Sequence, residues 1–173
     1  AVEYFLTPLN TVARQASLAK GLTLSENARL FALLNMAMAD GAISSFETKY
    51  HYGFWRPLTA IRHGDNDNNP ATERDATWRP IAETPMHPEY PCAHCIVSGA
   101  VGTVLRAEIG GGAMPKLTTT SVTAKGAVRS WSGIDDFEQE VANARVYDGG
   151  HYRTSAEIGT AMGKQVGALA VAK

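Results

Sequence analysis

The residues best suited to chemistry in this chain are cations and histidines that fall in three separate segments. Lys49 and Arg56 are seven residues apart, about two helical turns, so both cations can face the same side of a helix. Arg145 lies near the expected end of a later helix, and His151 follows a Gly-Gly turn. Cationic side chains bind tetrahedral oxyanions, and a histidine adds a nucleophile or a ligand, so the pattern predicts an oxyanion site.

The remaining segment, Cys92-Ala93-His94, is expected to open a helix, where free backbone N–H groups attract anions. His94 adds a second imidazole and a candidate general acid. Taken singly, all these residues have ordinary structural interpretations, such as a solvated charge, a helix-end salt bridge or a half-buried imidazole. Their joint spacing favours a functional site.

The chain has two cysteines, Cys92 and Cys95, which are too few for a disulfide framework. Two buried reduced thiols are the ordinary interpretation, and a reactive thiolate at the helix N-terminus is an alternative. A zinc site would need more ligands than this group supplies. In an oxidising compartment, Cys92 or Cys95 could instead link two copies of the chain through an intermolecular disulfide.

Helices must position these residues, because apolar residues at spacings of three and four mark several segments. Residues 24–52 predict a long helix whose crowded apolar positions indicate burial on most sides. Residues 63–91 are polar and rich in Asn, Asp and Pro, which is typical of a long structured loop. Residues 117–123 carry the one strand signal and predict a small hairpin or an edge strand. Further helices are expected over 8–20, from Pro57, and over 93–108, 132–147 and 154–172.

The sequence thus predicts a single all-α domain over residues 1–173, a helical bundle with at most a small β-hairpin. Its formal net charge of −1 argues against a general nucleic-acid or acidic-membrane binder. No segment approaches the ~18 uninterrupted apolar residues of a membrane span. The chain begins with Ala1 rather than Met, which we interpret as a processed or truncated form, secreted or vacuolar if a targeting segment was removed.

Longer motifs define a family resemblance. The first part of a three-part signature, a lysine followed after six residues by Arg-Pro, matches Lys49 and Arg56-Pro57. Arg145 and His151 have the spacing of its third part. The middle part, Pro-Ser-Gly-His, corresponds to residues 91–94. With the flanking segments 26–40 and 87–91, the chain resembles the vanadium-dependent haloperoxidase and type 2 phosphatidic acid phosphatase superfamily over about residues 20–173. It is most similar to soluble haloperoxidase-like members, including plant ones.

The resemblance implies the helical bundle of that superfamily and a site for vanadate, with phosphate or sulfate as other occupants. Lys49, Arg56 and Arg145 would hold the equatorial oxygens. The side chain of Cys92 and the peptide N–H of Ala93 would stand where the family places its remaining oxyanion donors.

The same resemblance implies roles for the two histidines. His151 would be the axial vanadium ligand in a peroxidase, or the nucleophile in a phosphatase, and His94 would be the acid–base residue. Vanadium would act as a Lewis acid toward peroxide, and halide would then be oxidised to hypohalous acid.

Four positions depart from the signature: Cys92 and Ala93 replace Ser and Gly, Ala144 replaces Ser, and Ser155 replaces Asp. A thiol is a weaker donor than a hydroxyl, and a hydrogen bond to a charged group contributes about 1.5–3 kcal/mol. Ser155 cannot stabilise an imidazolium as a carboxylate would, which weakens a phosphohistidine route. A cysteine beside a peroxide site would be oxidised, which argues against an efficient haloperoxidase.

The leading interpretation is therefore a vanadium haloperoxidase-like oxyanion-binding protein, with a soluble acid phosphatase less favoured. One alternative is an inactive carbohydrate-binding, lectin-like protein, motivated by the polar loop 63–80 with Trp78. Another is a storage homodimer, motivated by the cysteines and by the stripe Gly159, Gly163 and Gly167. Tight packing inside the domain is the ordinary explanation of that stripe, and a dimer contact is the other.

Overall fold

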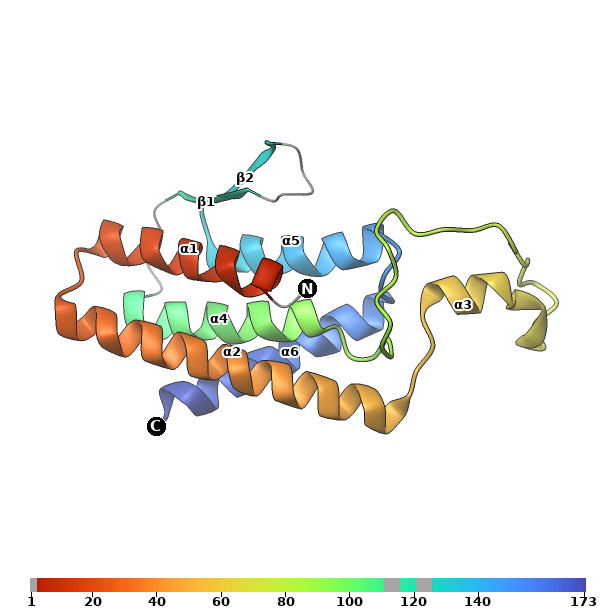
Figure 1. The fold of residues 1–173 in the computed structure, drawn as a ribbon, viewed down its shortest axis with the longest axis horizontal. Coiled ribbons are helices and arrows are strands. Elements are labelled where there is room, and N and C mark those ends of the chain that lie inside the picture. The colour runs from red at the N-terminus through yellow and green to blue at the C-terminus, as the bar shows by residue number, and fades with distance from the viewer. Residues whose placement is uncertain (1–2, 111–115, 121–125) are drawn as a thin grey trace.

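The chain folds into a helical bundle with a two-stranded antiparallel sheet, so the predicted all-α class and the small hairpin are confirmed (Figure 1). This computed structural model describes residues 3–110, 116–120 and 126–173. Its elements in chain order are α1 (Glu3–Lys20), α2 (Leu24–Tyr52), α3 (Pro57–Arg62), the short 3₁₀ helix η1 (Gly64–Asn66), α4 (Ala93–Ile109), β1 (Leu117–Thr120), β2 (Val128–Trp131), α5 (Ile134–Tyr147) and α6 (Arg153–Val171).

Helix α4 lies at the centre of the bundle, where it packs against α1, α2, α5 and α6 (Figure 1). Between Cys95 and Leu105 its sequence is apolar or small on every side, and a helix of that kind is stable only when other elements cover it all round. Side chains from Val97 to Leu105 join those of α1 and α2 in one hydrophobic core. Helix α4 is therefore held in place by four other helices.

Helix α2 is buried along one stripe, so the prediction of burial on most sides is wrong. Leu34, Met38 and Lys49 lie on the buried stripe, whereas Ile43 and Phe46 are exposed. Apolar residues on the outer face made the helix look more enclosed than it is, because periodicity cannot separate a core residue from an exposed apolar one. The buried stripe carries Lys49 to the interior at the C-terminal end of the helix.

Two predicted boundaries also change. Helix α1 begins at Glu3 rather than at Pro8, so the proline lies inside the helix and removes one backbone hydrogen bond. The strand signal over 117–123 corresponds to β1, and its residues 121–123 lie outside the described part of the chain. The second strand, β2, pairs Trp131 with Leu117 and brings the chain back toward the bundle at the start of α5.

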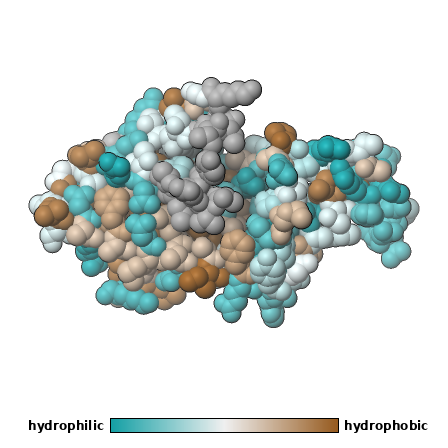
Figure 2. All heavy atoms as spheres, in the orientation of Figure 1, coloured by the Kyte–Doolittle hydropathy of each residue, from teal (hydrophilic) through white to brown (hydrophobic). Residues whose placement is uncertain are grey.

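Helix α3 and the loop that follows project beyond the bundle (Figure 1). The side chains of residues 65–77 are all exposed, and hydrophilic residues gather over this projection in Figure 2. The end of the loop returns to the bundle, where Ile81 N–H donates to Asp148 O and Glu89 N–H donates to Phe54 O. Within the described ranges, no helix is long and apolar enough to cross a membrane.

The glycine stripe of α6 packs inside the bundle, which confirms its ordinary explanation and removes it as a reason to expect a dimer. A Cβ atom on Gly163 would lie 2.0 Å from Ile96 O of α4, and one on Gly167 would lie 2.6 Å from Ala100 O. Gly159 faces the start of α4, 2.8 Å from Cys92 O by the same construction. The absence of side chains thus lets the backbones of α4 and α6 come together.

This contact predicts that Gly163→Ala destabilises the fold. A methyl group 2.0 Å from a backbone oxygen forces the two helices apart, and such overpacking costs about 1–3 kcal/mol or more. Gly41→Ala is the matched control, because its Cβ would meet the same residue, Ile96, at an ordinary 3.4 Å in a helix interior. Urea unfolding should show Gly163→Ala clearly less stable than the parent chain and Gly41→Ala equal or slightly more stable. Equal stability of the two variants would contradict the packing described.

Candidate functional site

Lys49 lies in the interior at the end of α2 with its ammonium group fully buried. Its Nζ donates to the carbonyl oxygens of Pro88 at 3.1 Å, Glu89 at 2.7 Å and Pro91 at 2.6 Å. Burial, with the nearby charge of Arg56, lowers the pKa of Lys49 to about 7. Lys49 therefore holds the 88–91 segment against α2, whereas the resemblance assigned its ammonium to an oxyanion.

Arg56 is also buried in this region, but it does not lie on the same helix as Lys49, although the seven-residue spacing suggested that it would. Helix α2 ends at Tyr52, Gly53 reverses the chain with φ 58°, and Arg56 is the N-cap of α3. Lys49 and Arg56 therefore do not share a helix face, although both are buried in one region. The α3 N-cap fits Arg56-Pro57, since proline is favoured at the first helical position.

The guanidinium of Arg56 bridges two segments far apart in the sequence. Nη1 donates to Gly150 O at 2.8 Å and lies 3.1 Å from His151 Nε2. Nε donates to His87 O at 3.2 Å. Burial lowers the pKa of Arg56, while the carboxylate of Glu89 opposes that change. Arg56 thus joins the loop before α4 to the turn before α6.

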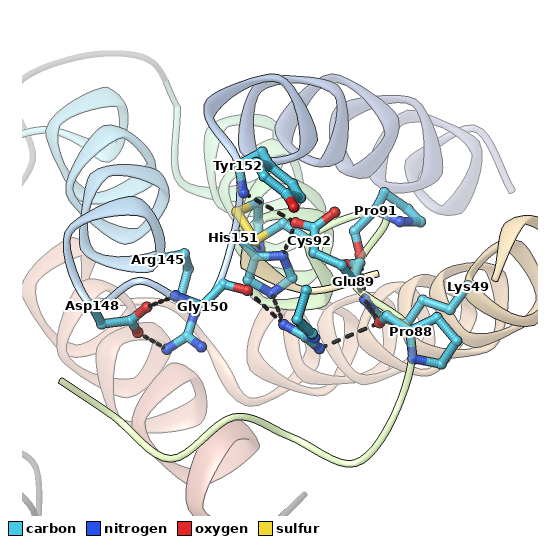
Figure 3. A network of polar contacts seen from close by, with 12 residues as sticks. Lys49, Pro88, Glu89, Pro91, Cys92, Arg145, Asp148, Gly150, His151 and Tyr152 are labelled. Atoms are coloured by element: carbon cyan, nitrogen blue, oxygen red, sulfur yellow. Dashed lines mark hydrogen bonds and ion pairs between the residues drawn. A yellow bond between two sulfur atoms is a disulfide. The ribbon is translucent and has the colours of Figure 1, made fainter. Parts of the chain in front are cut away.

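That turn, between α5 and α6, places the third group of predicted residues. Arg145 is in the last turn of α5 and forms a 2.6 Å ion pair with Asp148. Gly149 adopts φ 80°, and Gly150 N–H donates to Asp148 Oδ1 at 2.7 Å. The turn closes when His151 N–H donates to Arg145 O, and Figure 3 shows Arg145, Asp148 and His151 around it. The imidazole of His151 is thereby set beside Arg56.

Cys92 is the N-cap of α4 and is joined to Cys95 by a disulfide, with both residues fully buried. The predicted burial is confirmed, but the expected free thiols and an intermolecular disulfide through Cys92 or Cys95 are wrong, because the two sulfurs bond to each other. The disulfide leaves no S–H donor for an oxyanion, and Cys92 Sγ instead accepts from Cys95 N–H at 3.2 Å. It also leaves no thiol for peroxide to oxidise, which removes that objection to peroxide chemistry.

His94 lies in the first turn of α4 and is electrostatically coupled to the other predicted residues. Burial lowers the pKa of His94 to about 3, and the charges of Arg145, His151, Lys49 and Arg56 act in the same direction. Arg145 also contributes to lowering the pKa of Lys49. The charges of Lys49, Arg56, Arg145 and His151 therefore all act on His94, while the grouping of the five residues as one functional site stays a prediction.

Glu89 also contacts this cluster, although the spacing of the predicted residues did not point to it. It is fully buried, and its Oε1 lies 2.6 Å from His151 Nδ1 and accepts from Tyr152 N–H at 3.2 Å. Burial alone would raise the pKa of Glu89, but the hydrogen bond and charge of His151 hold it below its ordinary value. Burial in turn lowers the pKa of His151 to about 4. The pair is therefore a carboxylate and a neutral imidazole near pH 7. A carboxylate between two prolines was a usable signal in the sequence.

The other predicted sites receive less support. Trp78, offered as a sugar platform, is half-buried, and a Cβ on Gly149 would lie 2.7 Å from its ring. In the described ranges, no group of three or more His, Cys, Asp and Glu side chains is arranged to hold a metal ion.

A surface hollow of about 610 Å³ follows α5 and β2, between Arg129 and Tyr147. We place the chemistry in the buried cluster, because the hollow is lined by ordinary surface residues.

The cluster has the chemistry of an anion site. Three cations lie with two carboxylates, and both carboxylates already have partners, Glu89 with His151 and Asp148 with Arg145. Arg145 Nε is buried and makes no hydrogen bond within the described part of the chain. The Ala93 N–H adds a donor in the first turn of α4, where a helix supplies no acceptor of its own. An anion bound here would satisfy buried donors and offset excess positive charge.

Sequence comparison gives two matches. A family model described as the VCPO second helical-bundle domain matches residues 29–173. The chain is also 37% identical over 89 residues to the vanadium chloroperoxidase of Curvularia inaequalis, a match that covers 46% of this chain and 14% of that relative.

Solved structures of vanadium-dependent haloperoxidases have a similar fold. The crystal structure described as the first bacterial vanadium-dependent iodoperoxidase has a TM-score of 0.82 and 28% identity, and the match covers 95% of this chain and 38% of that one. A holo-type bacterial vanadium-dependent chloroperoxidase has a TM-score of 0.78, and the match covers 98% of this chain and 40% of that one. At 18% identity, this match shows a shared fold and nothing more. The chain spans less than half the length of each of these relatives.

The buried ammonium of Lys49 predicts a pH dependence of stability. Three carbonyls favour the charged form, but burial lowers the folded-state pKa from 10.5 to about 7, so between these values the unfolded chain carries a proton that the folded chain lacks. The free energy of unfolding should therefore rise with pH above 7, by about 1.4 kcal/mol per unit for one proton. Conversely, this contribution is lost as the pH falls toward 7.

Urea unfolding at pH 7, 8 and 9 measures this slope. Lys49→Met should lack it, since methionine has no proton to lose, while contributions from all other groups are common to both chains. Equal slopes in the two chains would show that Lys49 keeps its charge in the folded state.

Proposed function

The chain belongs to the family of the VCPO second helical-bundle domain, among the vanadium haloperoxidases and their relatives, and on this premise we propose that its buried cluster binds a tetrahedral oxyanion. The site is formed by Lys49, Arg56, Arg145, His94 and His151. Vanadate is the favoured occupant, and phosphate and sulfate have the same shape and can replace it. With vanadate bound, the proposed activity is peroxide-dependent halide oxidation.

The convergence of three cations from three distant segments carries this proposal. Arg56 contacts His151 directly, and the charges of Lys49, Arg56 and Arg145 all act on His94. Burying cations next to one another is unfavourable unless a counter-charge is supplied. Their two carboxylate neighbours are already engaged, so an anionic ligand accounts for the arrangement better than a purely structural role does.

The donor set fits vanadate. Arg145 Nε is a buried donor without a partner, and the Ala93 N–H points from the first turn of a helix. Arg56 would be a further donor to an oxygen. His151 Nε2 carries no proton, so it would be the ligand atom once the anion accepts the Arg56 Nη1 hydrogen bond that Nε2 accepts in the free protein. When bound, vanadium would supply a Lewis acid that activates peroxide without changing its own oxidation state.

Other features of this chain would modify the site. The disulfide removes the side-chain donor that the signature places at Cys92, which we expect to weaken oxyanion binding by about ten- to hundredfold. Lys49 would act mainly through the 88–91 segment, because its three N–H groups are already bonded to carbonyl oxygens. His94 is neutral in the free protein, and a bound anion would raise its pKa and so prepare it to donate a proton.

Hydrolysis of phosphate monoesters is a second candidate, supported by one contact. The Glu89 carboxylate at His151 Nδ1 supplies the partner that Ser155 cannot provide. A histidine so oriented can act as a nucleophile through Nε2. This contact answers the objection that the loss of the signature Asp weakens a phosphohistidine route.

Calorimetric titration with orthovanadate tests the proposed site. The parent chain should bind vanadate in the micromolar range, and inorganic phosphate should compete. His151→Ala and Arg145→Ala should each weaken binding by at least about tenfold, since each removes a charged or ligating group. His63→Ala is the matched control, because His63 is an exposed histidine in the projecting loop, and it should bind as the parent does.

Two assays then separate the candidate activities: bromide oxidation by peroxide in the vanadate-loaded protein, and hydrolysis of a phosphate monoester without vanadate. Absence of vanadate and phosphate binding in a folded parent chain, or undiminished binding in both site variants, would refute the oxyanion site.

A further inference from the structure

Glu89 makes the shortest contact to His151, and it does so from a different part of the chain than the signature carboxylate. Its Oε1 lies 2.6 Å from His151 Nδ1, and both side chains are buried (Figure 3). The residues are 62 positions apart in the sequence. In the family signature the corresponding carboxylate is an Asp four residues after the histidine, where this chain has Ser155.

The two contacts of the His151 ring determine which nitrogen carries the proton. Arginine has only donors, so Arg56 Nη1, 3.1 Å from Nε2, must donate and Nε2 must accept. The Glu89 carboxylate has only acceptors, so Nδ1 must carry the hydrogen that joins them. The imidazole is thus held as the Nδ1–H tautomer, with the Nε2 lone pair turned toward the cations.

Glu89 is itself held firmly on three sides. Its N–H donates to Phe54 O at 2.8 Å, its carbonyl accepts from Lys49 Nζ at 2.7 Å, and its Oε1 accepts from Tyr152 N–H at 3.2 Å. These bonds fix both the backbone and the side chain, so the carboxylate cannot turn away from His151 at little cost. A short charge-assisted hydrogen bond from a fixed partner sets the orientation of the ring.

Ser155 lies next to the same carboxylate. Its hydroxyl contributes to lowering the pKa of Glu89, yet Ser155 Oγ and Glu89 Oε2 are both buried and form no hydrogen bond within the usual distance in the described part of the chain. The position of the signature Asp therefore borders the space that Glu89 occupies. Two carboxylates this close would repel each other, and a serine at 155 avoids that repulsion.

We infer that Glu89 is the positioning residue of His151 and takes the place of the carboxylate that the chain lacks at Ser155. It holds the Nδ1 proton and leaves Nε2 unprotonated as the atom that meets the ligand. The inference rests on the proposed oxyanion function for its purpose, but the tautomer exists in the ligand-free protein and is measurable there.

The test is nitrogen-15 NMR of the His151 ring in the ligand-free protein near pH 7. The parent chain should show a protonated Nδ1, with its proton far downfield, and an unprotonated Nε2. Glu89→Gln should move the Nδ1 proton upfield, because a neutral amide is a weaker acceptor than a carboxylate. Glu83→Gln, an exposed glutamate in the same loop, should leave the signal unchanged.

The double variant Glu89→Gln/Ser155→Asp tests replacement directly and should restore the downfield proton, because it returns a carboxylate to the signature position. Calorimetry with inorganic phosphate should show about tenfold weaker binding for Glu89→Gln and recovery in the double variant. A purely structural role for Glu89 would not give recovery by a carboxylate at another position.

A parent chain protonated at Nε2, or an Nδ1 proton unchanged in Glu89→Gln, would overturn the inference. If Glu89→Gln does not fold, the tautomer of the parent chain still decides it. If the NMR signals behave as expected and no chain binds phosphate or vanadate, the role of Glu89 stands and the proposed oxyanion function fails.

Discussion

The buried ammonium of Lys49 is the contact on which the geometry of the site depends. A buried amino group requires polar partners, and here three backbone carbonyls of residues 88–91 supply them. The segment that provides these carbonyls is thereby fixed against α2. Glu89 is then directed at His151, and Cys92 is placed to begin α4. Residues 67–92 form no helix or strand, so the hydrogen bonds of Lys49 position the end of this segment as a strand or helix would otherwise do.

The close approach of α4 and α6 brings the two histidines into one region. His94 lies in the first turn of α4 and His151 just before α6, so their separation follows from how these helices cross. Glycines at 159, 163 and 167 allow backbone contact, and Cys92 N–H donates to Ser155 O at the point where the helices begin. The glycine stripe, for which a dimer contact was one explanation, thus allows the helix packing that brings His94 and His151 together.

Sequence departures from a signature have to be judged in three dimensions. Ser155 in place of Asp suggested a weakened histidine, and Cys92 in place of Ser suggested a thiol open to oxidation. For the first departure, Glu89 supplies a carboxylate to His151 from a loop 62 residues away in the sequence. For the second, the Cys92 sulfur is bonded to Cys95 and is not a free thiol. The lost side-chain donor at Cys92 has no such replacement among the contacts described, and under the proposed function this loss would weaken anion binding.

The sequence by itself determined the helical class, the small hairpin, and the types of side chain that gather at the site. These follow from local periodicity and from residue chemistry, which neighbours along the chain are enough to reveal. Through a family resemblance it also predicted that Lys49, Arg56, Arg145, His94 and His151 form one group. The tertiary structure decided what those side chains contact: Lys49 binds carbonyls, Arg56 donates to Gly150 O beside His151, and Glu89 orients His151. These contacts join residues tens of positions apart, and only the packing of α2, α4 and α6 brings them within hydrogen-bond distance.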